Sequence, residues 1–420
     1  MLGLTPYAWI TLGVIVLMLY LFFFTKVKND VVFLVAMTIF LVSGTLSTKQ
    51  TFSGFVSSAS LVVVFLGVIG TAMQKTHLVQ WTMDKLLQRA KSDKGVLWRL
   101  LLLSAALSMF ITNSVLGVLT YLSVDKWAKR VSSDKFQVSS SKLLLPIAFA
   151  IGLGGNMTII GSSQGMLWSE VYTSMTNQEV SLFAPFGLGL MCTVACLIPI
   201  YFMRNRLPEM KDSPEIPNST DLEFPHYSWR TIFSGLIMLV VILLSVFQVI
   251  NIVTGSVVGA MIVAFSGCVS HEDAWGGISW ATVTAIAGAK ALCTALTTSG
   301  LADAISYGIS AMCGGGVFIS LAVLVGAALI SSQLIKGNAV ISMILPVAIA
   351  TAVQEGVSPF PFALAVFITT GAQFCSSFCS AHMILVADQG KYTEKEIFRY
   401  GWPLFIVAFI TILLGTLLYL

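Results

Sequence analysis

Phe110-Ile111-Thr112-Asn113-Ser114-Val115-Leu116 interrupts an apolar run over residues 97–130 with three consecutive polar residues. A second stretch, Leu334-Ile335-Lys336-Gly337-Asn338-Ala339-Val340, interrupts the apolar run 318–353 in the same way. Each run is too long for one membrane span, which needs about 20 helical residues. Backbone left unpaired at membrane depth is tolerated only where protein buries it or where it lines a cavity. We therefore predict that each run is a re-entrant hairpin with a polar tip.

A broken apolar segment follows each hairpin, over 143–176 in the first half of the chain and over 361–386 in the second. The interruptions read Gly154-Gly155-Asn156 and Gly161-Ser162-Ser163-Gln164-Gly165 in the first segment, and Gly371-Ala372-Gln373 and Cys375-Ser376-Ser377-Phe378-Cys379-Ser380 in the second. Interrupted segments at corresponding places in two halves indicate the binding site of a secondary transporter. The pattern predicts two repeats whose breaks meet at one site.

The composition is that of a membrane protein. Of the 420 residues, 56% are hydrophobic and 10% are charged, whereas a soluble protein has about 25% charged residues. Apolar runs of span length recur along the chain, which predicts an all-α polytopic protein of the cell membrane, inner or plasma. Further spans are expected at 7–25, 31–48, 55–74, 182–203, 231–250, 252–270, 278–299 and 401–420. We interpret 7–25 as a retained span and not as a cleaved signal.

Basic residues set the expected orientation. Both flanks of the first hairpin are rich in Lys and Arg, whereas the flanks of the second, 300–317 and 354–360, carry acids and no basic residue. Because cytoplasmic loops are enriched in Lys and Arg, the first hairpin should open to the cytoplasm and the second to the outside. Counting spans from these anchors places both termini outside. The two halves are then inverted relative to each other.

The expected organisation has four parts. Residues 1–50 form N-terminal scaffold helices and 51–203 the first inverted repeat, with hairpin 97–130 and broken helix 143–176. Residues 204–230 contain four prolines among mixed charges, which is typical of a cytoplasmic linker. Residues 231–420 form the second repeat, with hairpin 318–353 and broken helix 361–386.

The polar residues of the two tips are the first candidates for a binding site. An asparagine side chain donates and accepts hydrogen bonds, so Asn113 and Asn338 are expected either to contact a ligand or only to cap a helix arm. A charge at membrane depth, such as Lys336, costs about 2.5–3.5 kcal/mol and is a functional candidate by default. Snorkelling or structural pairing of Lys336 is the alternative. Lys290 either lines an anion pathway or lies near a water-filled crevice without a role.

Intramembrane acids are scarce. Glu170 is the one acid expected near a span, and we place it at the outer interface. Two buried cations and the positive ends of half-helices favour an anionic ligand over a proton relay. The seven cysteines and four histidines show no disulfide or metal-site spacing. The sequence shows no nucleophile–base pair of the kind that would predict an enzyme. No nucleic-acid partner is expected.

In these motifs the chain resembles the divalent anion–sodium symporter family, within the wider ion-transporter superfamily. Members carry a Ser-Asn-Thr motif at each hairpin tip and a Gly-Thr-Pro-Pro-Asn-like loop in each broken helix. The corresponding stretches here are Thr112-Asn113-Ser114 and Gly161-Ser162-Ser163-Gln164-Gly165 in the first half, and Gly337-Asn338-Ala339 and Phe378-Cys379-Ser380-Ala381-His382 in the second. The resemblance extends from about residue 30 onward, and its second-half motifs are more divergent.

The resemblance implies an elevator: a transport domain that carries the site across a fixed scaffold, in a homodimer embedded in membrane lipid. It implies a sodium site at Ser108, Thr112, Asn113 and Gly161, and a second at the counterparts Lys336, Asn338 and Phe378. The residues that it places against a small anionic solute are Thr112, Asn113, Ser114, Ser162, Lys336, Gly337, Asn338, Ala339 and Cys379.

Two residues depart from the family pattern. Lys336 stands where the second sodium site would have a small residue, and we interpret it as a tethered cation that replaces that ion. His382 replaces the asparagine that ends the family loop, either as a neutral hydrogen-bonding group or as a proton-coupling group.

The sequence therefore predicts a secondary active transporter of a small, divalent anion, a dicarboxylate or an inorganic oxyanion, without a cofactor other than a possible sodium ion. Sodium coupling and anion exchange both remain open. The alternatives are a transport-dead membrane sensor or scaffold on the same fold, and a cation/proton or metalloid exporter of the same superfamily.

Overall fold

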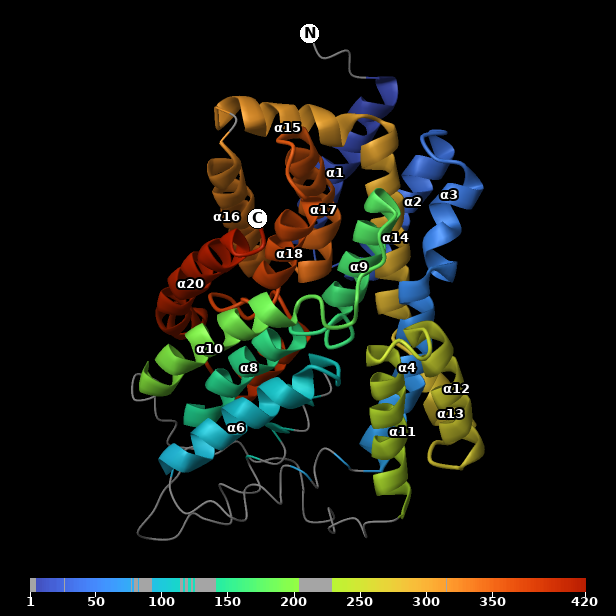
Figure 1. The fold of residues 1–420 in the computed structure, drawn as a ribbon, viewed down its shortest axis with the longest axis vertical. Helices are drawn as coiled ribbons and strands as arrows, with labels where there is room; N and C mark the ends of the chain where they lie inside the picture. Colours follow the sequence, from blue (N-terminus) through green and yellow to red (C-terminus); the bar gives the residue numbers. More distant parts are fainter. Residues whose placement is uncertain are drawn as a thin grey trace.

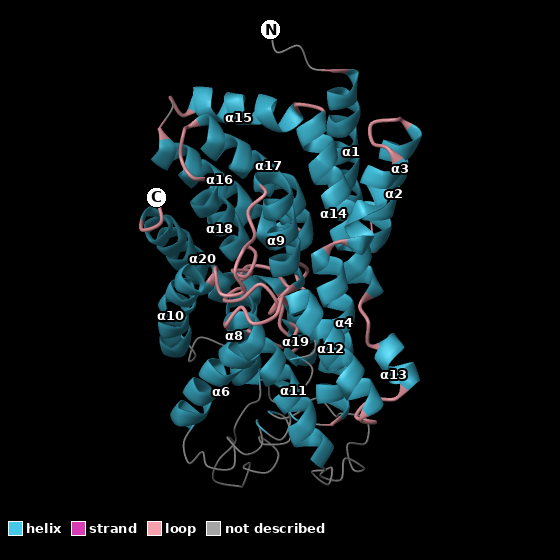
Figure 2. Ribbon diagram, turned by 45° about the vertical axis from the view of Figure 1, so that its right-hand side comes forward, coloured by secondary structure: helices cyan, strands magenta, loops and turns pink. Residues whose placement is uncertain are grey.

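The computed structural model describes residues 5–25, 27–76, 93–113, 141–203, 229–314 and 316–420, and seven single positions between 78 and 124 (Figure 1). Within these residues all regular secondary structure is helical (Figure 2). Seven helical segments in this part of the chain are long and apolar enough to cross a membrane. The prediction of an all-α polytopic membrane protein is confirmed.

The helices of the two halves follow the same order. The first half contains α1 (Pro6–Phe24), α2 (Asn29–Val42), α3 (Thr48–Phe52), the 3₁₀ turn η1 (Ser53–Val56), α4 (Ser58–Lys75), α6 (Asp93–Ser108), α8 (Ser141–Gly155), α9 (Ser163–Thr176) and α10 (Phe186–Met203). The second contains α11 (Trp229–Val246), α12 (Ile252–Phe265), α13 (His271–Gly276), α14 (Trp280–Thr298), α15 (Leu301–Met312), α16 (Val317–Leu334), α17 (Gly337–Gln354), α18 (Pro359–Thr369), α19 (Ala381–Gln389) and α20 (Glu394–Leu417).

The two series run in opposite directions. In Figure 1, α1 enters at the upper end of the molecule, where the N-terminus lies, and α11 enters at the lower end. Each half has one broken helix, α8/α9 in the first and α18/α19 in the second. α16 and α17 form the hairpin of the second half, and α6 leads into the tip predicted for the first. Most of the return arm of the first hairpin and the linker 204–228 lie outside the described residues.

Polar residues fix where several helices begin. Thr5 caps α1 and is followed by Pro6 at the first helical position, where a missing N–H costs nothing. Asn251 caps α12 through its side chain. Thr393 and Glu396 form a reciprocal capping box at the start of α20. These short polar signals between apolar runs separate the expected spans.

The helices form two groups, and in each group helices of the first half pack against helices of the second. In one group, α2 of the first half packs against α14 of the second, and α12 of the second half packs against α4 of the first. The other group contains the hairpins, the broken helices, α10 and α20, with α9 against α17 and α10 against α20. In Figures 1 and 2, the loops of the breaks lie in the middle of the molecule.

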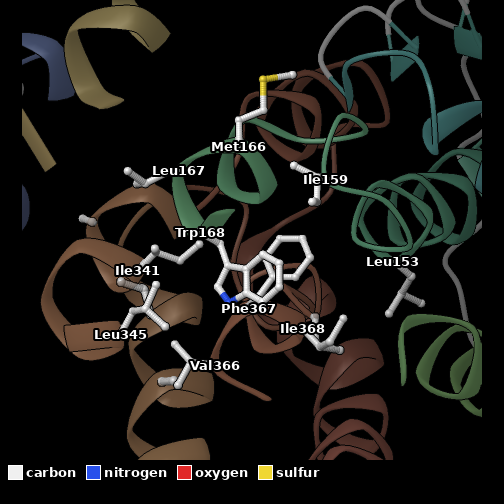
Figure 3. Close-up of a cluster of buried hydrophobic side chains, with 14 of the residues drawn as sticks. Leu153, Ile159, Met166, Leu167, Trp168, Ile341, Leu345, Val366, Phe367 and Ile368 are labelled. Carbon is white, nitrogen blue, oxygen red and sulfur yellow. The ribbon is translucent and has the colours of Figure 1, made fainter. Parts of the chain in front are cut away.

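An apolar cluster around Trp168 joins α9 to α17 and α18 (Figure 3). The indole ring of Trp168 is fully buried and stacks on Phe367 with ring centroids 5.2 Å apart. Its Nε1–H donates to the carbonyl oxygen of Ala363, 2.8 Å away. Because this donor is satisfied, the ring stabilises the group without leaving a polar atom unpaired.

We expect Trp168→Ala to lower stability strongly, by about 3–5 kcal/mol on the scale of buried aromatic truncations. The substitution leaves a void between α9, α17 and α18 and removes the donor to Ala363. The loss of stability is measured by thermal unfolding of the detergent-purified protein. Trp9→Ala is the control because that ring is 61% exposed. Equal loss of stability in both variants would contradict the role of this cluster.

Helix α15 was not predicted. The sequence suggested only an outward flank at 300–317, but Leu301–Met312 form a helix that crosses the upper end of the molecule in Figure 1. Gly300, with φ +74°, makes the turn from α14. The helix is short and amphipathic, with Leu301 buried and Met312 exposed, which is typical of a helix in a membrane interface.

Candidate functional site

The tips of the hairpins and the breaks of the helices surround one cavity of about 620 Å³. The residues that line it near the breaks are Phe110, Ile111, Thr112, Asn113, Gly152, Ile160, Ser162, Ser163, Gln164, Met166, Lys336, Asn338, Thr370, Gly371, Gln373, Cys379, Ser380, Ala381 and His382. The cavity extends to α4 and to Lys28, Asn29 and Asp30 at the start of α2. Two tips that are more than 200 positions apart in the sequence thus line one cavity.

The cavity is electropositive near the tips. Lys336 is exposed to it, and the first residues of α9, α17 and α19 lie in its wall. The N-caps of α17 and α19, Lys336 and Ser380, make no side-chain capping bond. Backbone N–H groups at a helix start carry the positive end of the dipole. Among the described residues of this wall, Asp30 is the sole carboxylate, so the site favours an anion.

The two helices of the second hairpin set the position of Lys336 at its tip. α16 ends at Leu334 and α17 begins at Gly337, so Ile335 and Lys336 form the two-residue turn between them. The extended backbone of Lys336, with ψ 141°, separates the two helices. No ion pair to Lys336 is found in the described part of the chain. Its ammonium is therefore available to a ligand in the cavity.

The two tip asparagines are held differently. The hydroxyl of Ser108 donates to Asn113 Oδ1 at 2.6 Å, and the Asn113 amide packs closely against Gly155. Asn338 Oδ1 accepts a longer hydrogen bond, 3.4 Å, from Ser163 on α9. Asn338 thus contacts the start of α9 at the first break, in the wall of the cavity.

Backbone carbonyl groups converge behind the first tip. A Cβ on Gly161 would lie 2.5 Å from the carbonyl oxygen of Ser108, 2.7 Å from that of Gly155 and 3.0 Å from that of Met109. Only a glycine fits at this position. Half-helix C-terminal carbonyl groups are the ligands that bind Na⁺ in broken-helix transporters. The oxygens around Gly161, with Asn113 Oδ1 nearby, suit such a cation.

Asn156 joins the two broken helices. Its Nδ2 donates to the carbonyl oxygen of Phe367 (2.9 Å) and to Thr370 Oγ1 (3.2 Å), and its Oδ1 accepts from Ser162 Oγ (3.1 Å). The side chain is 2% exposed. The Asn156 amide therefore hydrogen-bonds polar groups at the C-terminal end of α18 and positions Ser162, the N-cap residue of α9.

Lys290 and Glu170 form an ion pair, which the sequence had not suggested. The ammonium of Lys290 on α14 binds Glu170 Oε1 on α9, with side chains 20% and 11% exposed. The backbone N–H of Ala59, at the start of α4, donates to the other oxygen at 3.5 Å. The charge of each residue offsets the cost of burying the other, so Lys290 is not an isolated cation of the pathway.

His382 and Cys379 lie in the wall of the cavity. His382 is 5% exposed, and its ring nitrogen Nε2 lies 3.5 Å from Ser380 Oγ. It contacts Gly152 and Gly117 where a larger residue would clash. Cys379 is 1% exposed, and its thiol donates to the carbonyl oxygen of Ser376 at 3.0 Å.

The structure brings most of the predicted site residues together. The cavity wall contains Thr112, Asn113, Ser162, Lys336, Asn338 and Cys379. Ser108 and Gly161 are buried behind it, and Ser114 lies outside the described residues. Gly337 and Ala339 do not line the cavity. Successive helical residues point about 100° apart, so Ala339 turns into the interior when Asn338 faces the ligand space.

Sequence reasoning gave no site role to several polar residues of this region, although it quoted three of them as parts of the breaks. Asn156, Gln164, Gln333, Thr370 and Gln373 are polar residues in or beside the breaks. Their presence in otherwise apolar segments was the available signal. In the described part of the chain, no group of three His, Cys, Asp or Glu residues could hold a metal ion.

Comparison with known proteins agrees with this geometry. The family profile "Citrate transporter" (CitMHS) matches residues 19–368. An uncharacterized transporter of Synechocystis is 29% identical over 195 residues, which are 46% of this chain and 31% of that protein. One of Haemophilus influenzae is 23% identical over 386 residues, 88% of this chain and 82% of its own length. A probable sodium/sulfate cotransporter of Chlamydomonas reinhardtii is 25% identical over 141 residues, 33% of this chain and 15% of that protein.

The chain thus spans less than a third of the Synechocystis and Chlamydomonas relatives. Among solved structures, the YdaH transporter of Alcanivorax borkumensis has the same fold, with a TM-score of 0.64 at 14% identity over 98% of this chain and 97% of that one. The family profile covers most of the sequence, including both hairpins and the first broken helix. The chain belongs to the citrate transporter family, whose members are membrane transporters and not enzymes.

Proposed function

We propose that this protein is a secondary active transporter of a small multivalent anion. The observation that supports this most is the convergence of Lys336 and the N-termini of α9, α17 and α19 on one cavity between the two breaks. Several partial positive charges and one full charge act on the same point. A multivalent anion gains from all of them at once, and a neutral solute does not.

The candidate substrates are di- and tricarboxylates and inorganic oxyanions. The family is described as citrate transporters, and the Chlamydomonas relative as a probable sodium/sulfate cotransporter. In the proposed site Lys336 binds one acidic group, while Asn338 and Ser163 contact the rest of the anion. An ammonium acts as a point charge and suits a carboxylate or a sulfate.

Sodium is the proposed coupling ion of the first half. Three carbonyl oxygens face Gly161, and Ser108 and Asn113 lie beside them. Occupancy by Na⁺ would draw the first tip toward the first break and so favour anion binding. Binding of one ligand then raises the affinity for the other by the same factor.

The proposed movement is an elevator. The hairpins and broken helices would move as one body against α1, α2, α4 and α11–α14, which would form the fixed scaffold of a homodimer. The cavity reaches Lys28 and Asp30, which the proposed topology places on the cytoplasmic side with the linker 204–230, so this structure would be open inward. Both termini would lie outside.

A thermal-shift screen of the purified protein tests the substrate class. A ligand that binds the folded state raises the melting temperature by mass action; at a hundred times its dissociation constant it stabilises by about 2.7 kcal/mol. We expect one or more di- or tricarboxylates or oxyanions to raise the melting temperature, and monocarboxylates of similar size not to. Stabilisation by none of these anions, with or without sodium, would contradict the proposal.

The second candidate function is a non-transporting sensor. A putative sulfur deprivation response regulator of Chlamydomonas reinhardtii is 22% identical over 171 residues, 40% of this chain and 28% of that protein. Uptake of the best labelled ligand into proteoliposomes separates the two. A transporter accumulates label inside the vesicles, whereas a sensor binds it at most once per protein.

A further inference from the structure

The inverted repeat allows the two cation sites to be compared directly. In each half, the helix that enters the hairpin ends against the break of that half's broken helix: α6 meets the first break and α16 the second. If both junctions offered unpaired carbonyl oxygens, each would accept one cation. The first junction does offer them, around Gly161.

The second junction is occupied by a side chain. Gln333, one residue before the end of α16, is 6% exposed and extends to the second break. Its Nε2 donates to the carbonyl oxygens of Ala372 (2.8 Å) and Leu329 (3.0 Å), and it lies 3.0 Å from Ser332 Oγ. An NH₂ group thus lies among three oxygens at this junction, and it pairs the carbonyl oxygen that the second break directs toward α16, that of Ala372.

The carbonyl oxygen of the Gln333 side chain is also fully hydrogen-bonded. Gln333 Oε1 accepts hydrogen bonds from the backbone N–H groups of Phe374 (2.8 Å) and Cys375 (2.9 Å). Because carbonyl groups only accept and N–H groups only donate, these partners fix the orientation of the amide. Both protons and both acceptor positions of the Gln333 carboxamide are used, and the backbone groups of Ala372, Phe374 and Cys375 at this junction are paired without an ion.

Among the residues that the structure describes at the first junction, no amide takes an equivalent place. There Thr158 Oγ1 donates to the carbonyl oxygen of Met109, and its own oxygen accepts from Gly161 N–H at 3.1 Å. A threonine hydroxyl has one proton and serves one of the carbonyl oxygens. The oxygens of Ser108 and Gly155 remain directed at the same backbone position.

We propose that Gln333 permanently replaces the second cation, so that this protein binds no more than one sodium ion, in its first half. This inference deepens the proposed function and rests on it for the identity of the coupling ion. It separates two roles that the sequence had assigned to Lys336 alone: Gln333 fills the position of the ion, and Lys336, exposed in the cavity, is free to bind the anion.

Gln333→Glu tests the replacement without requiring transport. The variant keeps the shape but puts a carboxylate oxygen, in place of the NH₂ donor, among the oxygens of Leu329, Ser332 and Ala372. That arrangement needs a cation. We expect sodium chloride, compared with choline chloride at pH 8, to raise the melting temperature of Gln333→Glu by several degrees more than that of the wild type.

Gln354→Glu is the matched control. Gln354 lies at the far end of α17, where it accepts a hydrogen bond from Ser306 at 2.9 Å, so the same charge change there should give no added sodium response. A Gln333→Glu variant that gains no more sodium stabilisation than Gln354→Glu would overturn the proposal. These comparisons use no anion, so they stay informative if the anion screen fails.

The wild type gives an independent test if Gln333→Glu does not fold. Titration of sodium against wild-type melting temperature, and against uptake of any anion found in the screen, should follow a Hill coefficient of about 1. The charge-neutral Asn113→Ala, which removes the side-chain oxygen beside the first junction, should weaken this response. A Hill coefficient near 2 in the wild type would overturn the single-ion inference.

Discussion

Lys336→Ala is expected to lower anion affinity at least about 30-fold, because truncating one partner of a hydrogen-bonded charge pair costs 2 kcal/mol or more. The ammonium is the full positive charge exposed in the cavity near the tips, and the helix N-termini around it carry only partial charges. Its removal leaves a multivalent anion with a full negative charge uncompensated. Uptake into proteoliposomes and ligand-induced thermal shift both measure the effect.

The side chain and its charge are tested separately. Lys336→Arg keeps the charge and should retain part of the activity. Lys75→Ala removes a lysine paired with Asp273 at 2.7 Å on the surface, and should have little effect on uptake. Lys336→Ala that instead becomes sodium-dependent would show that an ion can take over the place of the ammonium. Unchanged uptake with unchanged cation dependence would refute a role for Lys336 in the site.

Glu170→Gln is expected to destabilise the protein by about 3–5 kcal/mol, since it leaves the ammonium of Lys290 buried without its partner. The same loss is expected for Lys290→Met, which strands the carboxylate. The melting temperature in detergent measures both. The exchange Glu170→Lys with Lys290→Glu should recover part of the stability, because it restores opposite charges across α9 and α14.

The double variant Glu170→Leu with Lys290→Met distinguishes stability from movement. Replacing both members of a buried ion pair by apolar residues is often neutral for stability. In the proposed elevator this pair joins the moving group, through α9, to the scaffold, through α14. We expect the double variant to be stable but to change its rate of uptake. Single variants as stable as the wild type would show that the pair contributes little.

The helices and the location of the candidate site could be predicted because the membrane interior restricts which sequences can lie within it. A polar tip or a glycine-rich break in an apolar run has to be buried or to line a cavity. For that reason Asn113 and Lys336 were singled out as polar interruptions of apolar runs, and Ser162 through the resemblance of its loop to the family's. The cavity wall contains all three. The inverted orientation followed from the positions of Lys and Arg.

The pairings between distant residues were not predictable in the same way. Glu170 and Lys290 are 120 positions apart, and nothing local to either residue indicates its partner. Gln333 looked like an ordinary polar residue before the second tip, because its hydrogen bonds to Ala372, Phe374 and Cys375 become visible only when α16 meets the second break. Helix α15 was missed because its amphipathic pattern occurs in a segment too short to span a membrane.

The exchange of partners between α2 and α14, and between α4 and α12, has a consequence for biogenesis. When the ribosome has released the first half, α2 and α4 have not yet met the helices that cover them, because those belong to sequence still to be synthesised. Until then, the faces of α2 and α4 that later contact α14 and α12 lie against lipid or an insertion chaperone. Covering of these faces is then a late event, completed only when α14 has been synthesised.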